Sequence, residues 1–216
     1  MAKDEGRSRS NAARPRKSGG FAEACPQPPE QDEIPSRCVV IDLEATCSDD
    51  GDVPRNEMEI IEIGAVIADA PDWSPLAEFQ TFVRPVRNAE LTAFCRELTG
   101  IEQSDVDAAP SFPAALAALA GWLSDWPDAV FCSWGDYDRR QFRRDCEYHS
   151  VGYPLGQRHI NLKERYAARF KLKRGRGLSW VLDQHGIRFD GRPHRALDDT
   201  RNITRLLPLI FDSPTS

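Results

Sequence analysis

Residues 38–46 read CVVIDLEAT, a run of β-branched and aliphatic residues that is interrupted by two carboxylates. Such an apolar run predicts a central strand that is buried on both faces. Side chains alternate along a strand, so Asp42 and Glu44 project from the same face, close enough to share one cation. Because buried charges are normally paired or bound to metal, these carboxylates indicate a metal site. The alternative is a strand whose polar face meets solvent.

Downstream, two more β-type segments follow after short connections, EIIEIGAVIAD at 59–69 and EFQTFVRP at 78–85. Three successive strands with short links predict an antiparallel meander. Apolar side chains at helical spacing predict an amphipathic helix over 112–126, with Ser111 as its cap. The remaining pattern predicts a strand at 128–135, a helix after it, a strand at 158–162, a helix stopped by Gly186 and a final helix at 196–211. This order of elements predicts a mixed α/β sandwich.

Upstream of the first strand, the composition changes. Residues 1–36 repeat Arg, Ser, Gly and Pro, and their only large apolar side chains are Phe21 and Ile34. Such a segment cannot bury enough surface to offset the entropy of ordering. We therefore predict a disordered tail over 1–36 and one folded domain over 37–213, as suits a chain of 216 residues.

Cysteine spacing and hydropathy exclude several classes of protein. The six cysteines form no CxxC pair, which favours buried reduced thiols over a zinc ribbon or a thioredoxin-type motif. No apolar run approaches the roughly 18 residues of a membrane span, and no apolar segment follows the charged N-terminus. The sequence therefore predicts a soluble cytoplasmic protein with no membrane contact and no organic cofactor.

A second acidic segment, CSWGDYDRRQF at 132–142, lies where the predicted fourth strand leads into a helix. This is the usual place for active-site groups in open α/β sheets, so Asp136 and Asp138 are both candidate site residues. Helix capping is the alternative for either side chain, above all for Asp136.

A third segment, HRALDDTRNITRLL, starts at His194 and contains two adjacent aspartates. In a helix, these two side chains point toward different faces. Asp199 is in register with the apolar positions of the helix and so faces the interior. Asp198 shares a stripe with Asn202 and Arg205, which predicts a solvated face. His194 lies just before the helix, and its alternative role is that of a structural or exposed histidine.

Together, these segments supply four carboxylates from separate elements and one histidine. Two hard divalent cations require such oxygen ligands, with room left for water and phosphate. The set predicts two-metal phosphodiester chemistry, in which metals about 3.5–4 Å apart activate water and stabilise the leaving oxygen. A histidine, whose usual pKa is near neutrality, can take the proton of that water.

The motifs VIDLEAT, WGDYD and HRALDD, in this order, resemble the three motifs of the DEDDh 3′-to-5′ exonucleases. This group belongs to the superfamily of RNase T and the DNA polymerase proofreading subunits. The histidine selects the DEDDh branch, because a sister group carries tyrosine there. Segments outside the site, 94–112 and 160–167, are most similar to the Eri1-like exoribonucleases, and the resemblance covers about 38–211.

The resemblance implies a ribonuclease H-like fold, a five-stranded mixed β-sheet flanked by α-helices. It implies two Mg²⁺ or Mn²⁺ ions per site, stepwise release of nucleoside 5′-monophosphates, and catalytic roles for His194 and Glu44. It also implies backbone contacts from Ala45 and Thr46 to the terminal nucleotide. Trp134 is a candidate for stacking on a base, with a core tryptophan as the alternative. The implied metal ligands are Asp42, Glu44, Asp138 and Asp199.

Three functional hypotheses follow. The leading one is a metal-dependent 3′-to-5′ exonuclease that acts on RNA or single-stranded 3′ ends. The second is a DNA exonuclease for repair or proofreading, because the same site cleaves both sugars. The third is a catalytically silent nucleic-acid-binding module on the same scaffold, against which the complete set of five signature residues argues.

The charge distribution bears on whether the chain binds a polyanionic partner. A net charge of −6 argues, by itself, against a polyanionic partner. Residues 139–176, however, contain twelve basic and three acidic residues, a local charge of +9 (12 − 3). A solvated helix face explains some of these basic residues. We nevertheless predict a basic track beside the metal site that contacts phosphates. This track ends in the Gly-rich segment KRGRG at 173–177.

Overall fold

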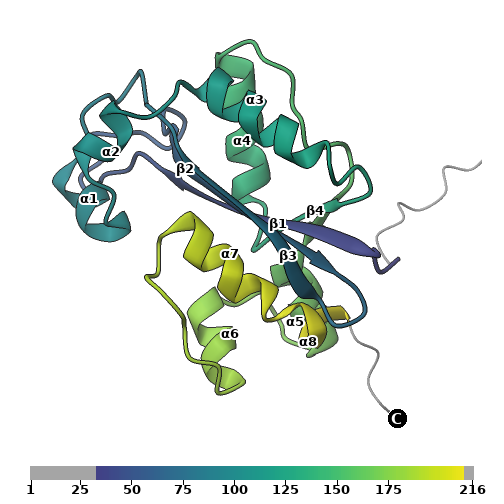
Figure 1. The fold of residues 1–216 in the computed structure, drawn as a ribbon. Coiled ribbons are helices and arrows are strands. Elements are labelled where there is room, and N and C mark those ends of the chain that lie inside the picture. Colours follow the sequence, from purple (N-terminus) through teal and green to yellow (C-terminus); the bar gives the residue numbers. More distant parts are fainter. Residues whose placement is uncertain (1–32, 212–216) are drawn as a thin grey trace, which may run out of the picture. The chain divides into compact units, whose positions relative to one another are not determined.

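The structure is a computed structural model that describes residues 33–211. The predicted tail lies outside the described residues except for its last four, and so do the last two residues of the predicted domain. The described part contains five strands and eight helices (Figure 1). In chain order these are β1 (Arg37–Ala45), β2 (Ile60–Asp69), β3 (Ser74–Phe82), α1 (Ala93–Thr99), α2 (Gln103–Asp107), α3 (Phe112–Leu123), β4 (Val130–Ser133), α4 (Tyr137–Tyr148), β5 (His159–Asn161), α5 (Leu162–Arg169), α6 (Leu178–Gln184), α7 (Ala196–Thr204) and α8 (Leu207–Phe211).

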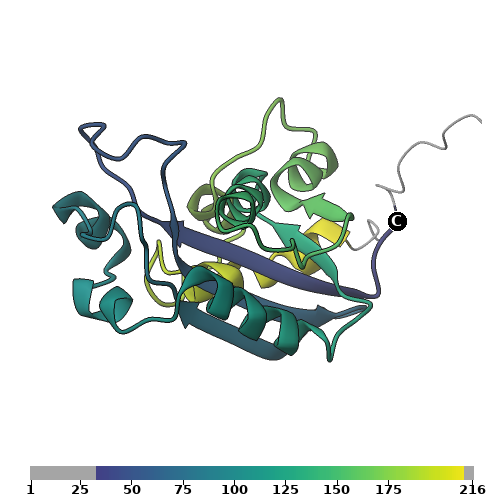
Figure 2. The ribbon, with the colours of Figure 1, turned by 90° about the horizontal axis from the view of Figure 1, so that it is seen from above.

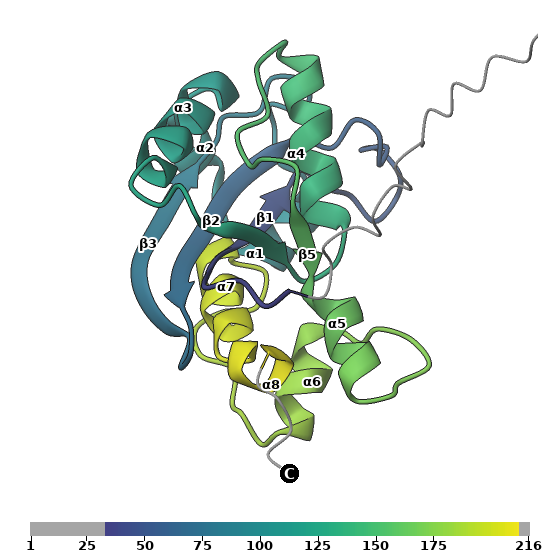
Figure 3. The same ribbon diagram turned by 90° about the vertical axis from the view of Figure 1, so that its right-hand side faces the viewer.

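The strands form one mixed sheet in the order β3-β2-β1-β4-β5, with β1 at its centre. β1, β2 and β3 pair antiparallel, as the predicted meander requires, whereas β4 and β5 add in parallel. Helices α3 and α4 cover one face of the sheet, and α5 to α8 cover the other (Figure 3). The predicted five-stranded α/β fold is confirmed.

Two apolar clusters flank β1, one on each face. Val39, Ile41 and Leu43 belong to the cluster under α3 and α4. Cys38 and Val40 belong to the cluster under α5 to α8. Alternation along the strand places residues 42 and 44 on the same face as Cys38 and Val40. On that face, β1 therefore has apolar side chains at its start and carboxylates toward its carboxyl end. The loop after β1 and helices α1 and α2 lie at this end of the sheet (Figure 2).

The final helix predicted over 196–211 is wrong as a single element. α7 ends at Thr204 and α8 begins at Leu207. Pro208 explains the break, because a proline ring clashes with the carbonyl of the residue four positions earlier, here Thr204, and cannot donate a hydrogen bond. Pro208 instead sits in the first turn of α8, where that missing donor costs little.

The third predicted strand is shifted, since β3 runs over 74–82 and not over 78–85. Ser74 pairs with Asp69 and Pro75 with Ala68, so proline lies inside the strand. β3 is an edge strand, where a residue without an amide hydrogen is tolerated, and the sequence pattern does not reveal which strand is at the edge. Helices α1, α2 and α5 are short and were not predicted as separate elements.

Cysteines of the described part are all free thiols, as predicted. Cys38, Cys95, Cys132 and Cys146 are buried and Cys47 is half-buried, whereas the remaining cysteine lies outside the described residues. Among the helices found between residues 33 and 211, none has the length and apolar character needed to cross a membrane.

Candidate active site

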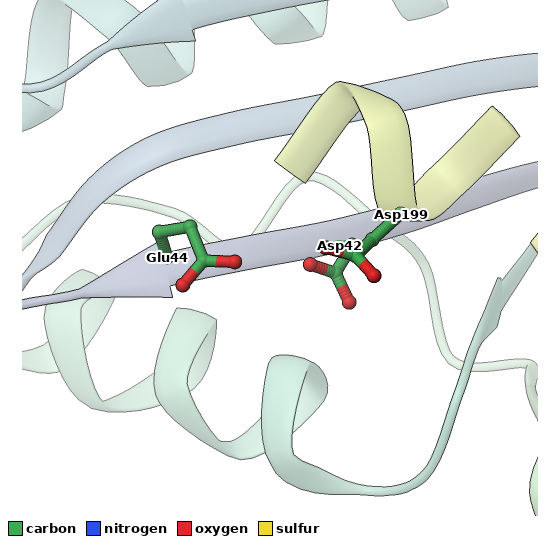
Figure 4. A group of neighbouring side chains, drawn as sticks. All are labelled: Asp42, Glu44 and Asp199. Carbon is green, nitrogen blue, oxygen red and sulfur yellow. The ribbon is translucent and has the colours of Figure 1, made fainter. Parts of the chain in front are cut away.

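Three carboxylates meet at the carboxyl end of β1. Asp42 and Glu44 extend from β1, and Asp199 extends from the first turn of α7. One oxygen of each lies within 4.8 Å of the others (Figure 4). Glu44 is buried, and the other two are half-buried. The structure therefore brings together three of the four acidic residues singled out in the sequence, from segments more than 150 residues apart.

The position of Asp199 depends on a glycine in β2. Gly64 is the cross-strand neighbour of Asp42. A Cβ on Gly64 would lie 2.3 Å from the carbonyl carbon of Ala196, well inside van der Waals contact. The absence of a side chain on Gly64 therefore lets the start of α7 rest directly on the sheet, and this contact brings Asp199 beside Asp42.

A buried glutamate in β2 binds the start of α7 through hydrogen bonds. Glu62 is fully buried and lies across the strand pair from Glu44. Its carboxylate accepts hydrogen bonds from the backbone N–H of Ala196 and from Nε and Nη2 of Arg195, each at 3.1 Å. The backbone N–H of Arg195 in turn donates to Asp199. Glu62 was not predicted as a site residue, although a charged residue inside the apolar run of β2 is a signal of such a role.

We predict that Glu62→Gln lowers the free energy of unfolding by about 2 kcal/mol, because it leaves a partly buried guanidinium without its counter-charge. Turnover should fall as well, since the start of α7 loses the ion pair that holds it to the sheet. Urea unfolding and initial rates measure both effects. The control is Glu78→Gln, whose partner Arg201 also lies on α7 but whose ion pair is exposed. That change should cost less than about 1 kcal/mol, and equal losses in the two variants would contradict the prediction.

The acidic cluster forms no ion pair with a cation in the described part of the chain. Within residues 33–211, no Lys or Arg forms an ion pair with Asp42, Glu44, Asp138 or Asp199. Burial, followed by repulsion from the neighbouring carboxylates, raises the pKa of Asp42 and Glu44 well above the usual values. Burial also raises the pKa of Asp199 to about 6. Groups that resist ionisation in this way accommodate a bound cation well.

Asp138 lies in the first turn of α4 and is 4% exposed. Its charge contributes to the raised pKa of Asp42, although Asp138 is not one of the three residues within 4.8 Å. Burial raises the pKa of Asp138 itself to about 7, and the ammonium of Lys163 is among the groups that oppose this rise. Asp138 is therefore beside the cluster, where a fourth ligand is expected.

Asp136 occupies the N-cap position of α4, but its side chain makes no capping hydrogen bond. It forms ion pairs with Arg139 at 3.0 Å and Arg140 at 3.5 Å. Of the two aspartates in this segment, Asp136 is thus neutralised by arginines, whereas Asp138 is buried next to the other carboxylates.

His194 is exposed and lies in the loop before α7. Its φ of 62° is in the left-handed region, which a residue other than glycine seldom adopts. The backbone N–H of His194 lies near the Asp199 carboxylate and lowers its pKa, against the effect of burial. His194 is thus at the margin of the acidic cluster, and such strained backbone is often found at functional sites.

The three candidate substrate-binding residues have different surroundings. Ala45 ends β1 just after a register shift, and Thr46 follows it. The backbone N–H of Thr46 donates to the carbonyl of Glu59 at 2.8 Å. Trp134 packs beside the cluster under α5 to α8, and its Nε1 donates to the carbonyl of Arg176 at 3.0 Å. The contacts of these three residues with a nucleotide stay predictions.

The predicted solvated stripe of α7 is wrong for Asn202. This residue is fully buried. Its Nδ2 donates to the carbonyl of Asp190 at 2.8 Å, and its Oδ1 accepts from the N–H of Asp190 at 3.0 Å. Asp198, which is half-buried, accepts from the N–H of Arg192 at 2.9 Å. The loop before α7 folds over this side of the helix, and periodicity within a helix cannot show such a contact.

A cavity of ≈ 600 Å³ lies between the loop after β1 and α4. Tyr137, one of its lining residues, directly precedes Asp138, but none of the four site carboxylates lines the cavity. Its lining is basic and partly apolar, a combination that suits a nucleotide. The lining residues are Arg55, Met58, Tyr137, Arg140, Gln141 and Arg144.

Comparison with known protein families gives one match over most of the described part. Residues 39–207 match the model of the RNase T family, which is described as an exonuclease family. The chain belongs to the RNase T exonuclease family. The predicted resemblance to this superfamily is confirmed.

Relatives of this RNase T family chain include two human proteins. Over 176 residues it is 34% identical to 3′-5′ exoribonuclease 1, a match that spans 77% of this chain and 50% of the relative. Over 190 residues it is 31% identical to ERI1 exoribonuclease 2, with 78% and 27% covered. The chain thus spans about half the length of the first of these relatives, and less of the second.

A solved structure supports the same relationship. The nuclease domain of 3′hExo, a DEDDh family member bound to rAMP, superposes on this RNase T family chain with a TM-score of 0.76 and 32% identity. The match covers 82% of this chain and 92% of that domain. This similarity confirms both the predicted ribonuclease H-like fold and the predicted DEDDh branch.

Proposed function

We propose that the chain is a metal-dependent 3′-to-5′ exonuclease that hydrolyses the phosphodiester bonds of RNA and releases nucleoside 5′-monophosphates. The observation that carries this proposal is the meeting of Asp42, Glu44 and Asp199 at one end of the sheet, without a cationic partner in the described part of the chain. Membership in the RNase T exonuclease family supports the same reaction.

The donor set fits divalent cations. Carboxylate oxygens are the ligands that Mg²⁺ and Mn²⁺ prefer, and uncompensated negative charge favours their binding. Asp42, Glu44 and Asp199 would hold the ions, with Asp138 as a further ligand. When bound, two such ions activate a water molecule and offset the charge of the phosphate and the leaving oxygen.

The other residues have distinct proposed roles. His194 accepts the proton of the attacking water; its exposure, and the closeness of its backbone to the Asp199 carboxylate, support this role. Glu44 lies at the end of β1 next to Ala45 and Thr46, which contact the terminal nucleotide. Trp134 is the candidate for stacking on a base. Each role remains part of the proposal.

RNA is the proposed substrate because the human relatives are named exoribonucleases and the 3′hExo domain was solved with rAMP. The proposal also includes the domain organisation, with a tail over 1–36 and the catalytic domain over 37–213, and a cytoplasmic location. DNA is the competing substrate.

One experiment tests the reaction and the choice of sugar. The purified chain is incubated with matched RNA and DNA oligonucleotides, each labelled at the 5′ end, with Mg²⁺, with Mn²⁺ or with EDTA. We expect RNA to shorten from its 3′ end in single-nucleotide steps with a cation and to stay intact in EDTA. Intact RNA under every condition would contradict the proposal, and shortening of DNA alone would assign the chain to DNA.

A further inference from the structure

A loop rich in cations joins α5 to α6 at the edge of the molecule (Figure 3). We call residues 169–176, RFKLKRGR, the basic loop, which starts at the last residue of α5. From residue 165 to residue 182 the sequence contains six basic residues and no acidic one. The five cations of the basic loop are Arg169, Lys171, Lys173, Arg174 and Arg176.

Within the described part of the chain, ion pairs do not neutralise the charges of the basic loop. No carboxylate among residues 33–211 forms an ion pair with any of its five cations. Arginines elsewhere do have such partners, as in the pairs Arg201–Glu78 and Arg37–Asp69. The whole chain has a net charge of −6, so this excess of positive charge is local to the basic loop. Concentrated positive charge without counter-charges is typical of a surface that binds a polyanion.

Aromatic rings accompany these cations. Phe170 is 39% exposed and Trp180, at the start of α6, is 37% exposed. The guanidinium of Arg176 lies 4.9 Å from the centre of the Trp180 ring. Cations interleaved with exposed rings suit single-stranded nucleic acid, whose phosphates bind the cations while its bases stack on the rings.

The basic loop is also connected to the candidate active site through Lys163. A Cβ on Gly175 would lie 2.5 Å from Cγ of Lys163, so the loop backbone rests against the stem of this lysine. The ammonium of Lys163 lies 3.6 Å from the point that a Cβ of Gly135 would occupy, three residues before Asp138. Trp134 adds a hydrogen bond from Nε1 to the carbonyl of Arg176. Positive charge therefore runs from the acidic cluster past Lys163 to the basic loop.

We propose that the basic loop is a second nucleic-acid subsite, which binds phosphates of the RNA strand on the 5′ side of the bond to be cleaved. This inference rests on the proposed function, because it assumes a strand whose 3′ end lies at the acidic cluster. A dinucleotide has one phosphodiester bond, which must lie at the cluster, so it leaves no phosphate for the basic loop. An RNA of about 20 nucleotides supplies many.

The test uses the double variant Lys173→Gln and Arg174→Gln in the full chain. Its control is Arg84→Gln with Arg188→Gln, which removes two exposed arginines that form no ion pair in the described part of the chain. Circular dichroism and the thermal midpoint check that both variants fold. Binding of fluorescent RNA is measured by anisotropy in EDTA, which prevents hydrolysis.

We expect the loop variant to bind an RNA of about 20 nucleotides about tenfold more weakly, while the control binds like the wild type. The slope of log affinity against log salt should decrease by about 1.4, that is, about 0.7 for each lost phosphate contact. Turnover of a dinucleotide under Mg²⁺ should stay within about twofold of the wild-type value.

Three results would overturn the inference: wild-type RNA affinity in the loop variant, an equal loss in the control, or a loss of dinucleotide turnover parallel to the loss of binding. Failure of the proposed function gives a different pattern. In that case the wild type hydrolyses neither substrate, yet the affinity still differs between the loop variant and its control, and the basic loop stands as an RNA-binding surface.

Discussion

Asp42→Asn should lower kcat about a thousandfold, which corresponds to about 4 kcal/mol of activation free energy. Asp42 lies at the centre of the cluster, where its carboxylate faces Asp199 from α7 and Glu44 from β1. The amide keeps the size of the side chain but removes a charge that holds cations. Initial rates on 5′-labelled RNA with Mg²⁺ and with Mn²⁺ measure the effect, and wild-type turnover in either cation would refute it.

The same variant should be more stable than the wild type when no divalent cation is present. Burial and neighbouring carboxylates raise the pKa of Asp42, so above its ordinary pKa the ionised form is less favourable in the folded chain than in the unfolded chain. Asp42 thus costs stability at neutral pH. This cost disappears below about pH 4, where the carboxyl is protonated in both states.

Thermal midpoints in EDTA at several pH values test this second effect. The midpoint of Asp42→Asn should exceed that of the wild type at neutral pH, and the two should converge as the pH falls. Added Mn²⁺ should raise the midpoint of the wild type more than that of the variant. The control is Asp72→Asn, because hydrogen bonding to Ser74 lowers the pKa of that exposed carboxyl and no stabilisation is expected. A lower midpoint of Asp42→Asn at neutral pH would contradict the argument.

His194→Ala should lower kcat by about 10² to 10⁴, the range expected when a general base is lost. Cation binding should persist, because the carboxylates are unchanged and the backbone N–H of residue 194 remains available to Asp199. The Mn²⁺-induced shift of the thermal midpoint should therefore match that of the wild type. Initial rates across the pH range complete the measurement, since loss of the base should also change the pH profile of kcat.

The matched control for this prediction is His185→Gln. His185 caps the end of α6, and its Nε2 lies 2.9 Å from the hydroxyl of Tyr166, outside the acidic cluster. Its turnover should stay near the wild-type value. Rates close to normal in His194→Ala would remove this residue from the proposed mechanism, and loss of the Mn²⁺ shift would assign it to cation binding instead.

Much of the site could be predicted from the sequence, because it depends on local periodicity. Alternation along β1 places Asp42 and Glu44 on one face, and helical register directs Asp199 inward. Both rules act within a few residues and do not require the rest of the fold. The apolar run around Asp42 likewise identifies the central strand of the sheet.

The remaining features depend on contacts between distant segments. Glu62 and Gly64 are ordinary members of a strand pattern until α7 packs against them. Asn202 has the position of a solvated residue until the loop before α7 covers it. The break in the last predicted helix arises from Pro208, whose steric effect interrupts an otherwise continuous apolar period.

Asp42 and Asp199 meet only after almost the whole domain has been synthesised. A growing chain on the ribosome contains the carboxylates of β1 early, but α7 emerges near the end of the domain, so the third carboxylate arrives last. Domains generally fold as units during synthesis, so the three-carboxylate cluster cannot assemble in a partly made chain. Under the proposed function, a nascent chain that does not yet contain α7 would be inert toward the messenger RNA beside it.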